Sequence, residues 1–388
     1  MIAYNNTWLF NLTVVKEAKR WLDEKIISEN SFRAIKENHP SQFYHPNLFI
    51  RILLFLATLV ALAGVTGFLG LLFAEAFSSA IEVLCILYGI GSWIFLEKFF
   101  IGNGKHYKSG VNEAMLYHSL GWTIGGISAL AEFDETFFLV VSLILLTFAA
   151  IRYADLVCTA LAFGFLGYII FDGFYSMGGI FTQIIPIVFL VIFTPAYFLV
   201  SRVRRKPTSE LWDDCLIVLE SLTLITIYAA GNYFVVRELS ESLLSIYLEP
   251  GQDIPFAWIF YILTITIPVI YLYFGITRKD MLMLRVSLIA IGFSAFTFKY
   301  YFSFGHPEVT LTLGGAILLT VSFALFRYLR VSRNGFIREQ LLKEKWAGAN
   351  PEAFIISQTL GGNKIGGDTS PEMGGGGEFG GGGSSDSF

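Results

Sequence analysis

The chain has 388 residues, of which 54% are hydrophobic and only 15% are charged. Soluble domains carry about 25% charged residues, so the composition excludes an ordinary soluble globular protein. Repeated apolar runs of membrane-spanning length, with a net charge of −4, predict an all-α, polytopic helical membrane protein whose main partner is the lipid bilayer. The three cysteines are too few and too widely spaced for a disulfide framework, and we expect them to be small buried side chains.

Residues 1–48 are polar and predict an amphipathic helical hairpin on the cytoplasmic surface. Apolar residues recur at helical spacing between Leu12 and Leu22, with charged residues between them. Ser28 or Asn30 is placed to cap a second helix. Two roles stay open for this hairpin. It binds a cytoplasmic protein partner, or it covers the base of the protein or the lipid headgroups.

Ten apolar segments within 51–329 are predicted to cross the membrane. They are 51–73, 80–96, 114–131, 136–151, 155–171, 180–200, 214–235, 256–276, 281–299 and 309–329. With ten crossings, all of the 27 Lys and Arg residues except Arg237 and Lys299 fall on one side. Because basic loops stay in the cytoplasm, this partition predicts ten spans with a cytoplasmic N-terminus and C-terminus.

The densest basic run, Arg202 to Lys206, lies between the sixth and seventh segments. Its simplest role is to hold that loop in the cytoplasm, and no nucleic acid is expected as a partner. The outer loops are acidic instead, with Glu75, Glu82, Glu132, Asp134, Glu135, Asp172, Glu238, Glu241, Glu249, Asp253 and Glu308. Such a surface attracts cations. The simpler explanation is that a face from which basic residues are excluded is left acidic.

Three further segments lie outside the spans. Residues 236–255 predict a short amphipathic helix on the outer membrane surface, and 331–347 predict a basic amphipathic helix at the cytoplasmic interface. Residues 348–388 are rich in Gly and predict a disordered tail, because such a composition cannot bury a core.

Glu220 is the strongest candidate for a functional residue, because an ionisable side chain inside a span is costly to bury. Thr223 lies three residues further on and Gly231 returns to the same side, which gives a polar stripe of a kind that lines cavities. The alternative is that Glu220 reaches the inner interface or bonds to a neighbouring helix there.

Prolines and glycines add weaker signals. Pro186, Pro195 and Pro268 lie within predicted spans and indicate helix kinks, which often flank transporter sites. Gly121 and Gly125 match the small-residue pattern of close helix packing. No zinc-protease pattern, nucleophile elbow or pair of midplane carboxylates is present. The sequence therefore predicts no cofactor, metal or catalytic residues and disfavours an intramembrane enzyme.

The segment Trp21-Leu22-Asp23-Glu24-Lys25-Ile26-Ile27-Ser28-Glu29, followed by short Gly- and Leu-rich spans, resembles the bacterial membrane proteins grouped as domain of unknown function 2157. Ile27-Ser28-Glu29 fits the family pattern, whereas Lys25 stands where glycine is usual. The resemblance covers about residues 12–170. It implies a multi-pass protein of the bacterial cytoplasmic (inner) membrane and carries over no functional residues.

Two functions follow as hypotheses. The first is a transporter of a small solute or ion with its site near Glu220 and the kinked spans. The second is a membrane scaffold or sensor that recruits partners through its cytoplasmic helices and tail.

Overall fold

The computed structural model describes residues 2–242 and 253–301, together with Gly315, Ala316, Leu319, Thr320, Phe323 and Arg327. Over these ranges the chain is helical, with one isolated bridge between Tyr44 and His106. Eight of the described helices are long and apolar enough to cross a membrane, which confirms an all-α, multi-pass class. The predicted tenth span lies outside these ranges except for the six single residues. The predicted interfacial helix and the tail lie wholly outside them.

The helices follow one another with short connections. In chain order they are α1 (Asn6–Asp23), α2 (Glu29–Asn38), α3 (Leu48–Leu72), α4 (Ala74–Phe95), the π-helical segment η1 (Leu96–Asn103), α5 (Val111–Leu130), α6 (Glu135–Tyr153), α7 (Leu156–Met177), α8 (Ile180–Gln183), α9 (Ile185–Arg204), the 3-10 helix η2 (Pro207–Trp212), α10 (Asp213–Gly231), α11 (Tyr233–Ser242), α12 (Ala257–Arg278) and α13 (Met281–Tyr301).

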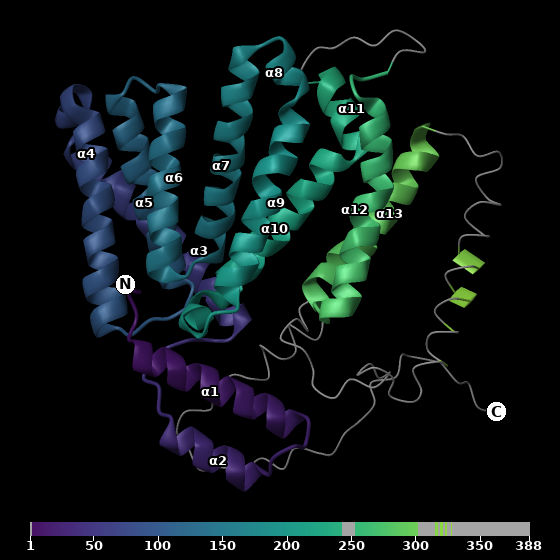
Figure 1. Ribbon diagram of the computed structural model, residues 1–388. Helices are drawn as coiled ribbons and strands as arrows, with labels where there is room; N and C mark the ends of the chain where they lie inside the picture. The colour runs from purple at the N-terminus through teal and green to yellow at the C-terminus, as the bar shows by residue number, and fades with distance from the viewer. Residues whose placement is uncertain are drawn as a thin grey trace, which may run out of the picture.

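The long helices stand side by side and form the body of the molecule (Figure 1). The eight apolar helices are α3, α4 with η1, α6, α7, α9, α10 with η2, α12 and α13. Helix α5 is of similar length but carries more polar residues, and its face is buried against α3, α4 and α6. It matches the segment predicted at 114–131, so nine predicted segments correspond to helices in the described part of the chain.

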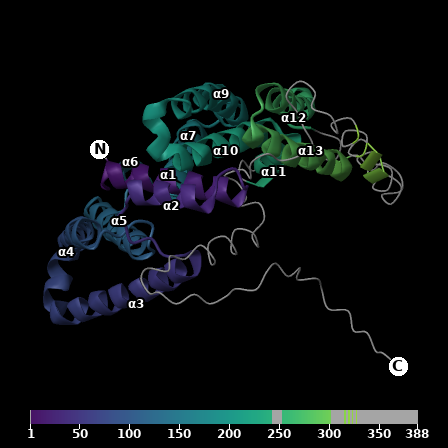
Figure 2. The ribbon, with the colours of Figure 1, turned by 90° about the horizontal axis from the view of Figure 1, so that it is seen from below.

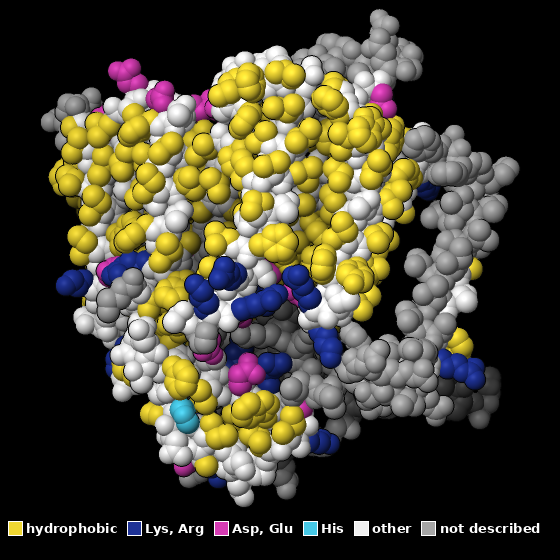
Figure 3. All heavy atoms as spheres, in the orientation of Figure 1, with side chains coloured by type: hydrophobic (Ala, Val, Ile, Leu, Met, Phe, Trp, Pro, Cys, Tyr) yellow, Lys and Arg dark blue, Asp and Glu magenta, His cyan; other side chains and the backbone are white. Residues whose placement is uncertain are grey.

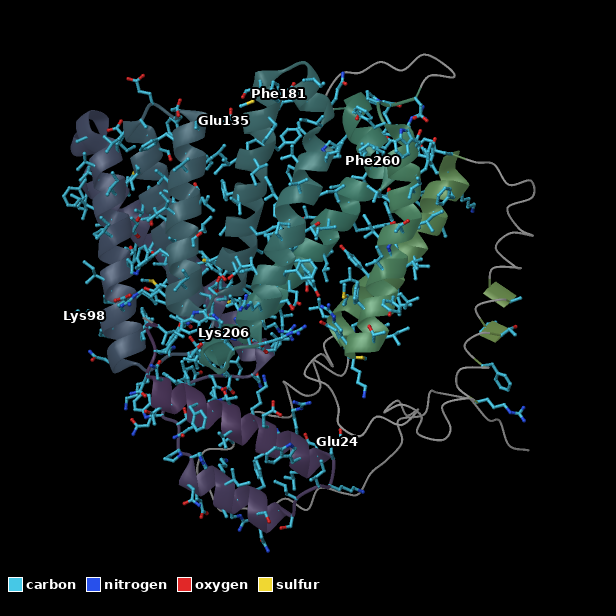
Figure 4. The ribbon with its side chains drawn as sticks, viewed as in Figure 1. Glu24, Lys98, Glu135, Phe181, Lys206 and Phe260 are labelled. Carbon is cyan, nitrogen blue, oxygen red and sulfur yellow. The ribbon has the colours of Figure 1, made fainter. Side chains whose placement is uncertain are left out.

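The two ends of this body differ in charge. Lys and Arg side chains gather at the end next to α1 and α2, and Asp and Glu side chains lie at the opposite end (Figure 3). Lys98 and Lys206 lie at the first end, and Glu135 and Phe181 at the second (Figure 4). We call these the basic end and the acidic end.

Helices α1 and α2 lie across the basic end, and α3 stands beside α4 and α5, away from α12 and α13 (Figure 2). Ser28 caps α2, with its hydroxyl accepting a hydrogen bond from Ser31 N at 3.2 Å. Residues before α1 enter the base of the bundle, where Tyr4 is buried and accepts a hydrogen bond from the Asn112 amide at 2.9 Å. The hairpin is therefore fastened to the spans through its N-terminal end.

The C-terminal end of α6 joins segments that are distant in the sequence. Ala3 N donates to Arg152 O at 2.8 Å, and Trp212 Nε1 donates to Ile151 O at 2.7 Å. Because the last carbonyls of a helix have no partner within it, these two donors satisfy groups that α6 leaves open. The turn to α7 is completed by Ala154 in the left-handed conformation, with φ of 49°.

Glycines set the closest approach between α4 and α5. A Cβ atom at Gly126 would lie 2.8 Å from Glu82 O and 2.8 Å from Ile86 N, which are backbone atoms of α4. A Cβ atom at Gly121 or Gly125 would meet nothing within 4 Å. In the described part of the chain, Gly121 and Gly125 therefore make no close helix contact, and their predicted packing role stays a prediction. Gly126, on a different side of α5, makes the close contact.

Gly126→Ala should lower the apparent unfolding midpoint of the detergent-purified protein by several degrees, because the added methyl group collides with the backbone of α4. Gly125→Ala is the matched control, one residue away and facing open space. A thermal scan monitored by size-exclusion chromatography measures both. Equal effects from the two substitutions would contradict this packing.

Candidate functional site

Glu220 lies on α10 and is almost fully buried, with 1% of its surface exposed. Its Oε2 accepts a hydrogen bond from Arg204 Nη1 at 2.6 Å, and the Arg204 Nε donates to Asp213 Oδ1 at 3.2 Å. Arg204 is the last residue of α9 and belongs to the basic run before η2. Glu220 thus bonds to a neighbouring helix, as the alternative reading of the sequence expected, and it does so near the basic end.

The surroundings of Glu220 neutralise it without exposing it to solvent. Arg204 keeps 28% of its side chain exposed and holds one buried and one partly exposed carboxylate, Glu220 and Asp213. A charge removed from water needs such a partner, because an unpaired buried ion costs several kcal/mol. Thr223 is also buried, and its hydroxyl donates to Leu219 O of its own helix at 2.6 Å. The site is a closed, charge-paired contact between α9 and α10.

The basic end carries two further pairs of the same kind. Arg51 Nη2 of α3 lies 2.6 Å from Glu113 Oε1 of α5. Arg152 of α6 binds Glu97 of η1 through both oxygens, at 2.5 Å and 2.9 Å. The fork of a guanidinium matches a carboxylate in this way. From the sequence alone, each of these arginines has only a predicted topological role, because its partner lies 55 or more positions away.

A second polar centre lies where α10 ends. Gly231 is the last residue of α10, Asn232 is extended with ψ of 124°, and α11 starts at Tyr233. The Asn232 Oδ1 accepts a hydrogen bond from Val235 N at 3.2 Å and so caps α11. Asn232 has no exposed surface. The helix is therefore interrupted inside the protein.

Helix α12 supplies the groups that the interruption needs. Thr264 Oγ1 accepts a hydrogen bond from Tyr233 N at 2.9 Å. Pro268 has no N–H, so it cannot bond to the carbonyl of Thr264 four residues earlier. Ser294 of α13 donates to that carbonyl at 2.7 Å instead. Thr264 lies seven residues from the start of α12, about 10 Å along the helix, so the break lies beside the body of α12 and not at its tip.

A chain of hydrogen bonds connects the three helices at this break. Asn232 Nδ2 donates to Tyr228 OH at 2.9 Å, and Tyr228 OH lies 2.8 Å from Ser294 Oγ. Asn232 Nδ2 also lies 3.1 Å from Thr297 Oγ1. All of these side chains are buried. We call Tyr228, Asn232, Thr264, Ser294 and Thr297 the break cluster. It presents neutral oxygen and amide groups, which suit a small polar solute or a weakly bound ion.

The residues predicted from the sequence fall in different places. Glu220 lies in the first half of α10, toward the basic end, with Thr223 three residues further on, and Pro268 borders the break cluster. Pro195 lies inside α9, whereas Pro186 occupies its first turn, where proline fits without a kink. Asn232 was missed. The available signal was an amide residue directly after Gly231 in an apolar run.

The described part of the chain holds no group of three or more His, Cys, Asp or Glu residues that could bind a metal ion. Two open hollows lie between α6 and α7, around Phe138 and Tyr168, and between α4 and α6, around Trp93 and Arg152. Neither is lined by Glu220 or Asn232. Both polar centres on α10 are therefore packed in this conformation.

Glu220→Gln should lower the apparent unfolding midpoint, because it leaves the Arg204 charge with only the Asp213 carboxylate. Arg204→Gln should do the same. The double variant should lose less than the sum of the two, since no unpaired buried charge remains. Thermal scans of all four proteins measure this coupling. Strict additivity would show that the 2.6 Å contact does not contribute.

Comparison of the chain with protein-family models, with curated proteins and with solved structures finds no match in any of the three. The resemblance to domain of unknown function 2157 stays a prediction from the sequence.

Proposed function

We propose that the chain is a transporter of a small polar solute or ion, with ten spans, both termini in the cytoplasm, and a location in the bacterial inner membrane. The observation that carries the proposal is the interruption of α10 at Asn232, within a buried cluster of polar groups from three helices. Non-helical backbone at membrane depth is tolerated where it is buried in protein or lines a cavity. Discontinuous helices are the usual setting of transporter sites.

The two polar centres of α10 have different parts in the proposed transport path. Asn232 and Glu220 are 12 residues apart, which is about 18 Å along a helix. Buried Leu224 and Ile227 lie between them. The break cluster is the proposed binding place, and the contact between Arg204 and Glu220 is the proposed inner closure. A solute reaching the cytoplasm would require that contact to open, and Asp213 would retain the Arg204 side chain while it is open.

The topology rests on charge. Basic side chains gather at the end next to α1 and α2 (Figure 3), and that end is proposed to face the cytoplasm. Among the described residues before 302, nine helices from α3 to α13 are 19 residues or longer, which is an odd number of crossings. The proposed tenth span at 309–329 would return the chain to the cytoplasm.

A fluorescent protein that folds only in the cytoplasm, fused after Phe388, should fluoresce in bacterial cells. The same fusion placed directly after Tyr301 should not, because nine crossings leave that residue outside. Alkaline phosphatase fused at the two positions should show the opposite pattern. Fluorescence from both fusions would overturn the ten-span proposal.

Asn232→Ala and Thr297→Val should each reduce solute efflux at least about tenfold, because each removes a group of the break cluster. The measurement uses proteoliposomes loaded with a bacterial metabolite extract, and mass spectrometry identifies what leaves. Glu220→Gln should also change the rate, through the inner closure.

Glu135→Gln is the control, since Glu135 lies at the acidic end and bonds to the exposed Tyr168. Its efflux should equal that of the wild type. Transport is contradicted if no solute leaves wild-type vesicles faster than protein-free ones. If the break-cluster variants keep the full rate of efflux, the solute-binding site lies elsewhere in the protein.

A scaffold or sensor is the second candidate, and the exposed side chains of the hairpin favour it. Phe10, Trp21 and Ile26 are 53%, 40% and 57% exposed, on a hairpin that is fastened to the spans through Tyr4. Aromatic and aliphatic side chains of this kind anchor protein contacts. An absence of flux in the efflux experiment would favour this function.

A further inference from the structure

The acidic end holds an arrangement that the break cluster does not explain. Arg237, on α11, is one of the two basic residues that the charge partition places outside. Its guanidinium lies over the ring of Tyr301, 5.0 Å from the centroid, and 6.0 Å from the centroid of Tyr233. Its Nη1 donates to Tyr233 OH at 2.8 Å, and its Nε to Glu241 Oε1 at 3.0 Å. A cation therefore sits among aromatic faces.

Three tyrosines from three helices form the walls. Tyr233 stacks on Tyr261 of α12 with centroids 4.2 Å apart and meets Tyr301 of α13 edge-on at 5.0 Å. We call Tyr233, Tyr261 and Tyr301 the tyrosine cage. Tyrosine faces attract cations through their quadrupole, most strongly for guanidinium and ammonium groups. Two of the rings, Tyr301 and Tyr233, lie within 6.0 Å of the Arg237 guanidinium, and Tyr261 stacks on Tyr233. Electron-rich rings next to a guanidinium give a geometry in which organic cations are recognised.

The carboxylates at the cage outnumber its cation. Tyr233 OH donates to Asp253 Oδ1 at 2.6 Å, and Tyr261 OH donates to Asp253 Oδ2 at 3.0 Å. Tyr301 OH donates to Glu238 Oε1 at 3.0 Å. Among the described ion pairs, Arg237 bonds only to Glu241, while Asp253 and Glu238 join none.

The simplest alternative ligand for the tyrosine cage is a metal ion, and these observations exclude it. The carboxylates are spread around the rings, and no group of three acidic or imidazole side chains in the described ranges could hold a metal ion. A small organic cation satisfies both the rings and the carboxylates, whereas a compact hydrated metal ion does not. Arg237 itself shows which chemical shape the cage accepts.

We propose that the tyrosine cage is a binding site for a small guanidinium-type organic cation, and that the Arg237 side chain occupies it as a tethered competitor. The cage begins at Tyr233, directly after Asn232, so its ligand would stand at the outer entrance to the break cluster. The inference goes beyond the proposed function, because binding at the cage is an equilibrium property that requires no flux.

The test is ligand binding to the full-length, detergent-purified protein, with methylguanidinium as the probe and calorimetry or saturation-transfer NMR as the readout. Arg237→Gln should bind methylguanidinium about tenfold or more tightly than the wild type, because the competitor no longer fills the site. Tyr301→Leu, placed in the Arg237→Gln background, should abolish that gain. N-methylurea, a neutral molecule of similar shape, should not bind.

Arg278→Gln is the matched control, because Arg278 also lies over a ring, that of Phe274, but at the basic end. It should leave binding unchanged. Size-exclusion chromatography checks that each variant is folded. Equal affinity of the wild type and Arg237→Gln, or equal binding of N-methylurea, would overturn the proposal. A lack of flux with intact binding would overturn only the transport function.

Discussion

Three arginines at the basic end, each paired with a glutamate of another helix, hold the spans in register. Arg51 joins α3 to α5, Arg152 joins α6 to η1, and Arg204 joins α9 to α10. Positive charge in these loops orients the chain in the membrane, and the same charge then binds the acid of a neighbouring helix. Insertion and packing therefore use the same side chains. An arginine fits both tasks, because it stays charged in any setting and presents a fork of donors.

Helix α10 is the axis of the second half of the molecule. It packs against α7, α9, α12 and α13, and it has the largest buried share of the eight apolar helices. Two buried polar residues along it bond to other helices, Glu220 to α9 and Asn232 to α13, while Thr264 of α12 secures the chain directly after Asn232. Such a helix cannot move without exchanging hydrogen bonds at both ends. At Asn232 the backbone hydrogen bonds of the helix are already interrupted.

The helical class, the N-terminal hairpin and the approximate positions of nine long helices were predictable, because apolar length and periodicity are local properties of the sequence. The burial of Glu220 was also predictable, since it is a single carboxylate within an apolar run. Its partner Arg204 was not, because a pairing across helices depends on their rotation. Gly125 and Gly126 illustrate the same limit. Gly125 fits the small-residue pattern with Gly121 and Gly126 does not, yet the rotation of α5 brings Gly126 against α4.

The end of α6 carries an implication for biosynthesis. The carbonyl of Ile151 receives the indole N–H of Trp212, a residue made 61 positions later, after α7 and α9. Until the ribosome has delivered η2, that carbonyl can be satisfied only by water at the membrane surface. The carbonyl at the end of α6 therefore stays hydrated until Trp212 of η2 has been synthesised and can donate to it. A chain stalled before residue 212 should keep α6 and α7 inserted. The C-terminal end of α6 and the N-terminal end of α7 should then stay accessible to solvent.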